Sequence, residues 1–449
     1  MRLSFQLFSR LKRAIRWLLP GLFVKRWMMT SGLGLLIALI GASVWADLRP
    51  IYWLVERLFW FLGFITTFLP RTITGPIVFF VGIFLLIWGQ GRSFDSIKQA
   101  VGSKGSKKDT FLVDALRAQQ KLNRGPNIVA IGGGTGLSSL LKGLKRYSSR
   151  ITAIVTVADD GGSSGVLRRE LGVQPPGDIR NCLAALATEE HLIKGLFQYR
   201  FSTGSGLEGH SFGNLFLSAL TAITGSLETA ISASSRVLAV QGQVVPATNV
   251  DVRLWAELED GERIEGESAI GKAQFPIIRI GCYPEQPPAL PRALEAIKNA
   301  EIILIGPGSL YTSILPNLLV PEIVNAIERS KAPKLYICNL MTQPGETDGL
   351  DVTGHVRAIE SQLASRGITR KIFNSILAQN ELEPSALIDY YKSKGSEPVK
   401  CNKVDLLSKG YKVYLASLQG SEATPTFRHD PKSLAVAIMR FYRSYKKGK

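Results

Sequence analysis

The chain has 449 residues, of which 45% are hydrophobic and 20% are charged, and these proportions exclude a disordered polymer and a small disulfide-stapled scaffold. Its four cysteines (Cys182, Cys282, Cys338 and Cys401) include no CxxC pair, which excludes a cysteine-based zinc module on spacing and suggests a reducing compartment. The net charge is +18, and a strongly basic chain suggests nucleic acid or an anionic membrane as a partner.

The positive charge is concentrated near the start of the chain. Residues 1–108 carry 15 Lys and Arg against 3 Asp and Glu, a net charge of +12, and residues 109–449 carry the remaining +6. The modest charge of the larger part comes without a recognition motif, so we expect no nucleic-acid binding. The basic amino-terminal part instead favours topology control and attraction to anionic lipid.

Residues 1–92 have the features of a membrane anchor. Two long uncharged apolar runs occur there, and a helix needs about 20 mostly apolar residues to cross a bilayer. We predict a transmembrane helical hairpin with spans at about 28–46 and 72–89, and an interfacial segment or third span at 51–69. Both flanks are basic, so the positive-inside rule predicts a multi-pass protein of a cytoplasmic-type or inner membrane, with its carboxyl-terminal domain in the cytoplasm. A cleaved signal peptide is the competing interpretation, and the late, long first run argues against it.

We predict a polar linker at residues 93–125 and an α/β domain at residues 126–449. Short apolar runs alternate there with helical patterns: NIVAIGGG, ITAIVTVADD, EIILIGPGS, KLYICNL and YKVYLASL. Such runs predict buried parallel strands, and their alternation with helices predicts a Rossmann-like, doubly wound, mostly parallel sheet. At about 241–272 the pattern changes to period two around Asp260-Gly261, which predicts an antiparallel hairpin insertion.

A glycine-rich turn follows the first predicted strand of this domain. Gly132, Gly133, Gly134 and Gly136 allow the backbone to approach an anion, Thr135 adds a hydroxyl, and the helix start supplies N–H donors. This pattern favours a phosphate or diphosphate ligand. The dinucleotide fingerprint is incomplete, since leucine stands at its last glycine position, and no Walker A lysine follows. The alternative is an ordinary tight turn between strand and helix.

Two aspartates and a second glycine-serine turn end the next predicted strand. Asp159 and Asp160 lie where such folds place a ribose-binding acid, and adjacent carboxylates can also hold Mg²⁺ or act as a base toward an attacking hydroxyl. Ser163 and Ser164 belong to a second predicted anion site at a helix start. The alternative is that one of these side chains only caps the helix.

Two further motifs add polar side chains, each with a structural alternative. In PPGDIRN, Asp178 is placed to cap a helix, Arg180 to reach a phosphate and Asn181 to bond a base or sugar. In HSFGN, His210 and Asn214 precede an apolar helix and are candidates for ligand contacts. A cap with a surface arginine explains the first motif about as well, and a capping or core histidine explains the second.

The fifth motif repeats the order of strand, glycine turn and hydroxyl-rich helix start. Gly306, Gly308 and Ser309 form its turn. Two anion-friendly turns at strand ends suggest a cleft at the switch point of the sheet, where open α/β folds bind ligands. Residues 339–347 end another predicted strand with polar side chains and are candidates to line the same cleft.

GGGTG, ADDGGSSG, PPGDIRN, HSFGN and GPGSLYTSILPN occur in this order between residues 126 and 420. Together they resemble the gluconeogenesis-factor (YvcK/GlmR-like) branch of the phospholactate transferase-like (CofD-like) superfamily. In the related transferase an aspartate assists metal-dependent transfer, and the resemblance implies Asp160 as its catalytic counterpart. The resemblance does not extend to the membrane segment. It implies a nucleotide pocket formed by Gly133, Gly134, Thr135, Asp159 or Asp160, and the turn from Gly306 to Ser309.

The resemblance implies a regulator rather than a dedicated enzyme. It implies binding of a nucleotide sugar such as UDP-N-acetylglucosamine, or of NADP, and a role in cell shape and envelope synthesis during gluconeogenic growth. We expect a membrane-tethered homo-oligomer that acts on a cytoplasmic enzyme of envelope precursor synthesis. The first alternative is a Mg²⁺-dependent phospholactate-type transferase with a nucleoside diphosphate donor. The second is an NADP-binding oxidoreductase, which the incomplete fingerprint disfavours.

Overall fold

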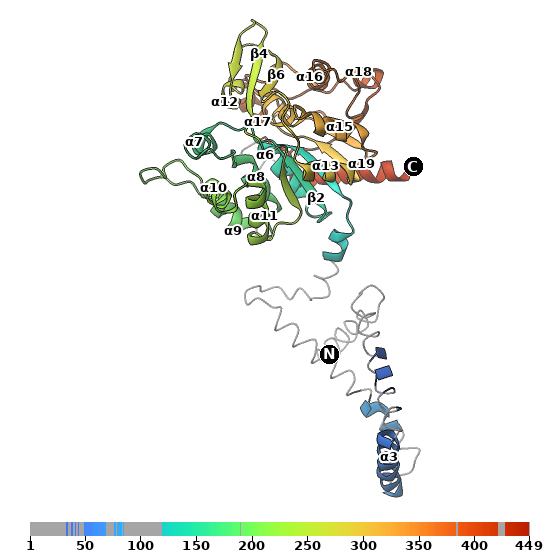
Figure 1. Cartoon of the computed structure of the whole chain (residues 1–449). Coiled ribbons are helices and arrows are strands. Elements are labelled where there is room, and N and C mark those ends of the chain that lie inside the picture. The colour runs from blue at the N-terminus through green and yellow to red at the C-terminus, as the bar shows by residue number, and fades with distance from the viewer. Residues whose placement is uncertain are drawn as a thin grey trace. The chain divides into compact units, whose positions relative to one another are not determined.

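In a computed structural model the chain divides into two compact units, Met1–Ala118 and Gln119–Lys449 (Figure 1). The structure describes residues 49–68, 119–188, 190–382, 385–420 and 427–448, together with single positions and short stretches between 33 and 84. The division falls within the predicted linker.

One helix, α3 (Arg49–Phe68), is the main described element of the first unit. It covers the third apolar segment, and its side chains include Trp53 and Trp60, which are largely exposed. Among the described residues no single helix has both the length and the hydropathy of a membrane span. Two pairs of consecutive helices in the second unit have that length and hydropathy when the two helices are taken together, but each pair is sharply bent. The predicted spans at 28–46 and 72–89 fall mostly outside the described residues, so the transmembrane hairpin stays a prediction.

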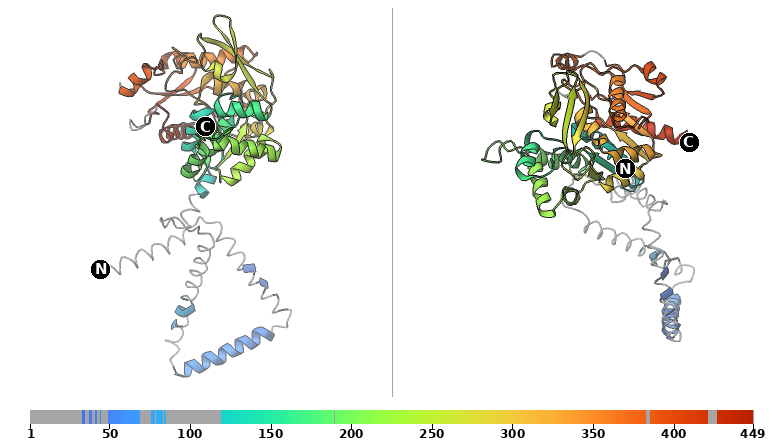
Figure 2. Two further views of the ribbon diagram at one scale, coloured as in Figure 1. Left: turned by 90° about the vertical axis from the view of Figure 1, so that its left-hand side faces the viewer. Right: turned by 45° about the horizontal axis from the view of Figure 1, so that its top comes forward.

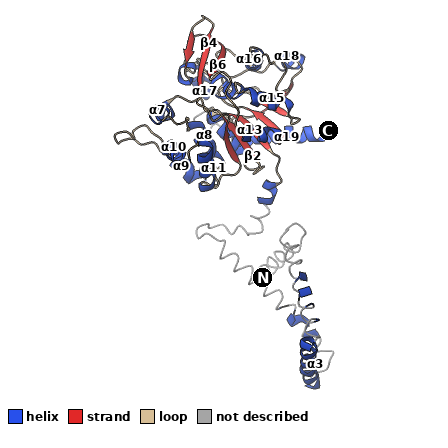
Figure 3. Cartoon of the chain, in the orientation of Figure 1, coloured by secondary structure: helices blue, strands red, loops and turns tan. Residues whose placement is uncertain are grey.

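The second unit is built on a seven-stranded sheet whose neighbouring strands are all parallel (Figure 3). The order β10-β9-β8-β7-β1-β2-β3 runs one way from β1 to β3 and the other way from β7 to β10, which confirms the doubly wound arrangement. The strands are β1 (Ile128–Gly132), β2 (Ile151–Val155), β3 (Gln243–Pro246), β7 (Ile302–Ile305), β8 (Lys334–Ile337), β9 (Ser375–Gln379) and β10 (Lys412–Ala416).

Burial on both faces explains the sequences of the central strands. Every residue of β1 and β7 is buried, so these strands are continuous apolar runs rather than alternating ones. The five apolar runs that predict parallel strands form β1, β2, β7, β8 and β10. The other two strands carry no such run, since β9 has one β-branched residue and β3 lies in the region predicted as the insertion.

Helices cover both faces of the sheet, and the strand order decides which face each one covers (Figure 2). Right-handed crossovers from β1 toward β3 put α6 and α8 on one face, and those from β7 toward β10 put α15 and α16 on the other. The last helix, α19, returns to pack against α6. The helices are α6 (Gly134–Leu144), α7 (Gly162–Leu171), α8 (Gly177–Leu186), α9 (Glu190–Gln198), α10 (Phe212–Thr224), α11 (Leu227–Val237), α12 (Glu267–Ile270), α13 (Pro291–Lys298), a π-helical turn η1 (Leu310–Ile314), α14 (Leu315–Leu318), α15 (Pro321–Arg329), α16 (Val352–Ala364), α17 (Ala386–Lys392), α18 (Lys403–Ser408) and α19 (Pro431–Lys447).

A small antiparallel sheet is inserted between β3 and β7. It consists of β4 (Arg253–Leu258), β5 (Arg263–Glu265) and β6 (Ile277–Tyr283), in the order β5-β4-β6. The hairpin predicted around Asp260-Gly261 is present, since β4 and β5 pair antiparallel and Gly261 has a φ of +86°. The structure sets the bounds of the insertion differently, because β3 pairs with β2 in the main sheet and β6 adds a third strand.

Gly143, near the end of α6, provides a test of the contact between α6 and α19. A side chain there would overlap the carbonyl oxygen of Pro431 at the start of α19. We expect Gly143→Ala to lower the free energy of unfolding by about 1–3 kcal/mol, because α19 would have to move away. Gly195→Ala in α9, where nothing lies within 4 Å of the added Cβ, is the control and should change it by less than about 1 kcal/mol in either direction. Urea unfolding measures both, and equal effects would contradict the prediction.

Candidate functional site

The two glycine turns meet where the strand order reverses, between β1 and β7. β1 leads directly into α6, which begins at Gly134 with a φ of +63°. The turn after β7 begins at Gly306, whose φ is +79°, and continues through Pro307. A Cβ on Gly136 would lie 2.6 Å from the carbonyl oxygen of Pro307, so the missing side chain lets the two turns pack together.

Two asparagines hold these turns from neighbouring elements. Asn317 of α14 donates from Nδ2 to the carbonyl oxygen of Gly132 at 3.1 Å. Asn339, just after β8, accepts from the N–H of Gly308 at 3.2 Å and donates to the carbonyl oxygen of the same residue at 2.8 Å. One backbone group of the first turn and two of the second are therefore held by side chains of neighbouring elements.

Asp178, in the first turn of α8, places its carboxylate in the first glycine turn. It accepts a hydrogen bond from the N–H of Gly134, and a side chain on Gly133 would collide with its Oδ2. Burial raises the pKa of Asp178 to about 6, against the opposing effect of the bond from Gly134. The predicted phosphate turn thus faces a carboxylate. An anionic ligand would be repelled there unless Asp178 is protonated or a cation lies between the two charges.

Asp159 and Asp160 point in different directions. Asp159 accepts from the N–H of Gly161 at 2.9 Å, and its other oxygen faces Gly177 at the start of α8. Asp160 accepts from the N–H of Ser268 at 2.8 Å, which ties the segment after β2 to α12 of the insertion. Across the described ranges, no group of three or more His, Cys, Asp or Glu side chains is arranged to hold a metal ion. Asp159 therefore faces α8 and the site, whereas Asp160 anchors the insertion.

A buried polar network joins the second and fourth motifs. Ser163 Oγ lies 3.0 Å from His210 Nδ1, and Asn214 Nδ2 donates to Ser163 Oγ at 3.1 Å and to Ser164 Oγ at 3.3 Å. Ser164 and Asp159 both face Gly177, so this network lies beside the aspartate. The starts of α7 and α10 are thereby fixed to each other.

Arg180 connects α8 to the same network. Its Nη1 donates to the capping residue of α10, Ser211, at 2.6 Å, and its Nη2 donates to Asn181 Oδ1 at 3.1 Å. A Cβ on Gly213 would lie 2.7 Å from Arg180 Cδ, so the glycine makes room for the arginine. Within the described part of the chain, Arg180 Nε and Asn214 Oδ1 are buried without a hydrogen-bond partner. Such atoms beside a site are candidates for ligand contacts.

Glu267 enters the site from the insertion. It begins α12, and its Oε2 lies near the segment that follows Asp160, 4.0 Å from a Cβ placed on Gly161. Burial raises the pKa of Glu267 to about 8, and the carboxylates of Asp159 and Asp178 raise it further. No sequence motif marks this residue, because only the packing of the insertion over the end of β2 brings it to the site.

The segment 339–347, predicted to line the cleft, reaches the second turn. Gln343 donates to Ser309 Oγ at 2.8 Å. Glu346 accepts from Thr312 Oγ1 at 3.0 Å and from the N–H of Tyr311 at 3.3 Å, and burial raises its pKa. Of the other predicted residues, Thr135 is exposed in the first turn of α6. All five motifs lie at the carboxyl-terminal edge of the sheet. Each motif either directly follows a parallel strand or packs against another motif that does.

Glu267→Gln tests the electrostatic crowding of the site. The pKa of Glu267 is about 8 in the folded chain and 4.5 in its ordinary state, so the folded chain binds this proton more tightly. The stabilisation of the folded chain by this proton is therefore complete below about pH 4.5 and is lost as the pH rises toward about 8. We expect the wild type to lose stability relative to Glu267→Gln over this interval, as measured by urea unfolding at several pH values.

Glu265→Gln is the matched control, because Glu265 is exposed on β5 only two residues away. Its stability profile should follow that of the wild type. Parallel profiles for the wild type and Glu267→Gln would show that Glu267 does not carry the raised pKa.

Comparisons with known proteins show the family to which the chain belongs. The chain matches the family described as 2-phospho-L-lactate transferase CofD over residues 128–419. It is 52% identical over 440 residues to a protein of Nostoc sp. (strain PCC 7120) that is described as a gluconeogenesis factor, covering 98% of this chain and 95% of the relative. It is 46% identical over 314 residues to the gluconeogenesis factor of Bacillus subtilis (strain 168), covering 70% of this chain and 97% of the relative.

A solved structure covers the same part of the chain. The crystal structure of a upf0052 family protein from Bacillus halodurans is 46% identical, with a TM-score of 0.66, and covers 70% of this chain and 99% of that chain. The match to the Nostoc relative also includes most of the first unit, whereas the Bacillus relatives match about the length of the second. From its five motifs, its fold and these matches, the chain belongs to the CofD family and, within it, to the gluconeogenesis factors.

Proposed function

We propose that this protein is a regulator that binds a nucleotide sugar resembling UDP-N-acetylglucosamine. The observation that carries the proposal is the meeting of two glycine turns with the starts of α6, α7 and α8 where the strand order reverses. Helix starts offer N–H donors and the positive ends of helix dipoles, and open α/β sheets bind ligands at this point. A nucleotide sugar has a diphosphate between a nucleoside and a sugar, and a site built from several helix starts suits a ligand of this kind.

The diphosphate would lie against Gly133, Gly134 and Thr135. Because the carboxylate of Asp178 already accepts from Gly134, we propose that Mg²⁺ accompanies the ligand and is held by Asp159 and Asp178 together with phosphate oxygens. Magnesium commonly binds through one or two carboxylates plus substrate phosphates, which fits described residues that supply no complete ligand set of their own. The metal would neutralise the repulsion between the phosphate and the two aspartates.

The nucleoside or sugar end would meet the buried network of α7, α8 and α10. Asn214 Oδ1 is an unpartnered acceptor and Arg180 Nε an unpartnered donor. An N–H or hydroxyl group of the ligand would satisfy Asn214, and a carbonyl or phosphate oxygen would satisfy Arg180. Ser163 and His210 would then act by holding Asn214 in place.

The regulatory role rests on the family. The Bacillus subtilis relative is named a gluconeogenesis factor. We propose that ligand occupancy controls the supply of envelope precursors, and so cell shape, during gluconeogenic growth, through a cytoplasmic enzyme as partner and with the protein as a homo-oligomer. The ligand would be sensed rather than consumed.

A membrane tether formed by residues 1–92 is part of the proposal. Its support is the net charge of +12 on residues 1–108 and the two apolar runs of the sequence. Within α3, Trp53, Trp60 and Phe64 are exposed, and large exposed apolar surfaces mark contacts with lipid or with another protein.

A Mg²⁺-dependent transferase of the phospholactate type is the second candidate, and one observation favours it. Burial raises the pKa of Asp178 to about 6 and that of Glu267 to about 8. Carboxyl groups that titrate near neutrality are suited to exchange a proton with an attacking hydroxyl. An NADP-binding oxidoreductase has less support, since Leu137 stands where the dinucleotide fingerprint requires glycine.

Thermal unfolding with added ligands decides among these functions. UDP-N-acetylglucosamine with Mg²⁺ should raise the Tm without being consumed, because a ligand that binds only the folded state stabilises it by RT ln(1 + [L]/Kd). Guanosine diphosphate with Mg²⁺ and turnover of an acceptor would establish the transferase. A shift with NADP, together with reduction of the bound NADP by a substrate, would establish the oxidoreductase. If the UDP-sugar at about millimolar concentration does not change the Tm, the proposal of a nucleotide-sugar sensor is wrong.

Asp178→Asn tests the proposed place of the metal. Removing the negative charge beside Gly134 should tighten nucleotide binding in the absence of Mg²⁺ at about pH 8 by roughly tenfold, and added Mg²⁺ should then contribute little. Isothermal titration with and without Mg²⁺ measures this. Asp260→Asn, at the exposed hairpin turn, should keep the wild-type Mg²⁺ dependence. An Asp178→Asn protein with unchanged Mg²⁺ dependence would place the cation elsewhere.

A further inference from the structure

The charges of the second unit are sorted by the edge of the main sheet at which they lie. All seven strands are parallel, so the segments that lead into them share one edge, the amino-terminal edge. The segments at this edge carry 14 Lys and Arg and one acid, Glu301. They are residues 119–127, 145–150, 238–242, 298–301, 329–334, 365–374 and 409–412. Because residues 109–449 as a whole carry only +6, the remaining residues of this part of the chain are net negative.

Helix dipoles explain only part of this separation. Cations are favoured at helix ends and anions at helix starts, which fits the carboxylates of Asp159 and Asp178 at the opposite edge. Arg150, Arg370 and Lys412, however, lie beyond the ends of the preceding helices and are exposed. The positive charges of Arg150 and Lys412 are available to a partner, whereas that of Arg370 pairs with Glu328 at 3.1 Å.

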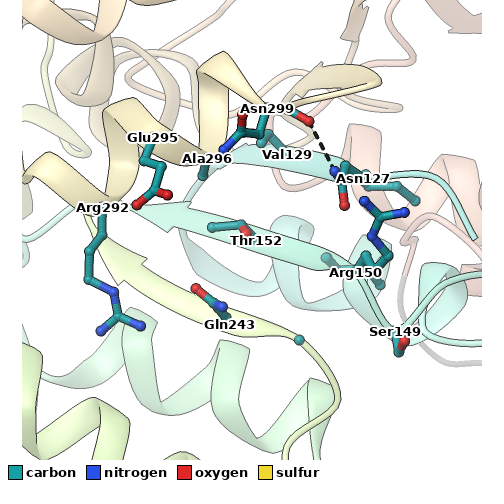
Figure 4. A pocket seen from close by; sticks show the side chains of 13 residues that line it. Asn127, Val129, Ser149, Arg150, Thr152, Gln243, Arg292, Glu295, Ala296 and Asn299 are labelled. Carbon is teal, nitrogen blue, oxygen red and sulfur yellow. Dashed lines mark hydrogen bonds between the residues drawn. The ribbon is translucent and has the colours of Figure 1, made fainter. Parts of the chain in front are cut away.

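A cavity of about 540 Å³ opens at the amino-terminal edge, between the starts of β1 to β3 and α13 (Figure 4). Arg150 and Arg292 lie toward its opposite ends, with Thr152 and Gln243 between them. Arg292 also pairs with Glu228 at 3.4 Å. Glu295 is the acidic side chain that lines this cavity. The two guanidinium groups suit an anionic headgroup that carries hydroxyl or ester oxygens.

A second cavity, of about 400 Å³, lies between α16 and the segment that leads into β9. Arg357, Arg370 and Lys371 line it, with Glu360 as the acidic side chain among them. Two cavities thus occur along one edge of one sheet, and in each of them cations outnumber the one acidic side chain. A flat anionic partner with many separate charged groups would fill both at once, which a single small ligand would not.

We infer that the amino-terminal edge of the main sheet docks on the headgroups of an anionic lipid bilayer. This inference rests on the membrane part of the proposed function, because the chain passes from the first unit into the second at residue 119 and into β1 at this same edge. The segment that enters there carries +12 and the apolar runs, which favours a bilayer over nucleic acid. Docking in this way would leave the glycine turns, at the opposite edge, open to a diffusing nucleotide.

The fragment Gln119–Lys449 tests this face without the first unit. The Bacillus halodurans structure, whose whole chain corresponds to this part, shows that such a unit folds alone. We expect the fragment to sediment with phosphatidylcholine vesicles that contain about one-third phosphatidylserine, and to stay in solution with phosphatidylcholine alone. Raising the salt to about 1 M should release it, because the Debye length falls to about 3 Å.

Two double variants with the same change in net charge distinguish binding through this face from a general effect of net charge. Arg146→Glu with Arg150→Glu, at the amino-terminal edge, should lower the vesicle partition coefficient at least about tenfold. Lys392→Glu with Lys394→Glu, exposed beyond β9 at the opposite edge, makes the same net change and should lower it less than about threefold. Unchanged circular dichroism and an unchanged Tm shift with nucleotide show that both variants are folded.

Three results would overturn the inference. These are no binding of the fragment to anionic vesicles, an equal loss for both pairs of reversals, and tighter binding to duplex DNA or RNA than to vesicles. The nucleotide response of the same fragment, and the retention of the full chain in membranes after an alkaline carbonate wash, report on the sensor and on the tether separately. Failure of the docking face can therefore be told apart from failure of the proposed function.

Discussion

The contact between Gly136 and the turn after β7 is the constraint on which the site depends. A Cβ at Gly136 would lie 2.6 Å from the carbonyl oxygen of Pro307, so any side chain there would force α6 away from β7. With glycine, the start of α6 and the second turn form one surface at the point where the strand order reverses. Asn317 then holds the carbonyl of Gly132, and Asn339 holds the N–H and carbonyl groups of Gly308. The helix that carries the anion-friendly start is held in turn from behind by α19.

Electrostatics gives the unit two unlike edges. At the carboxyl-terminal edge, Asp159, Asp178 and Glu267 crowd together, and burial keeps the pKa values of two of them near neutrality. Such crowding is costly in the free protein, and a ligand that brings a cation or a proton would relieve it. The segments that lead into the strands at the amino-terminal edge carry 14 Lys and Arg and one acid. A net charge of +6 for residues 109–449 therefore hides an uneven distribution of charge.

The relation between sequence and structure differs from one element to another. Strands buried on both faces tend to be continuous apolar runs, which makes β1, β2, β7 and β8 evident from their residues alone. β10 is evident from its apolar run as well, although its residues are partly or fully exposed. β9, with one β-branched residue, and β3, beside a region of period-two alternation, lack that signal. The same limit applies to the site. The glycine turns and the serine and aspartate motifs follow strands and are visible locally, whereas Glu267 reaches the site only because the insertion folds over the end of β2.

The α/β class, the doubly wound sheet and the edge at which the motifs lie follow from the sequence alone, because apolar runs, helical periodicity and glycine turns are local patterns that recur along the chain. The sequence also determined the family, because five motifs occur in one order. The direction of each side chain follows from the tertiary structure. Asp160 holds Ser268 of the insertion, Asp178 enters the glycine turn, and His210 supports Asn214 through Ser163. These hydrogen bonds join residues up to about a hundred positions apart. Each polar side chain has several possible partners in the local sequence, and the packing of helix starts against one another selects among them.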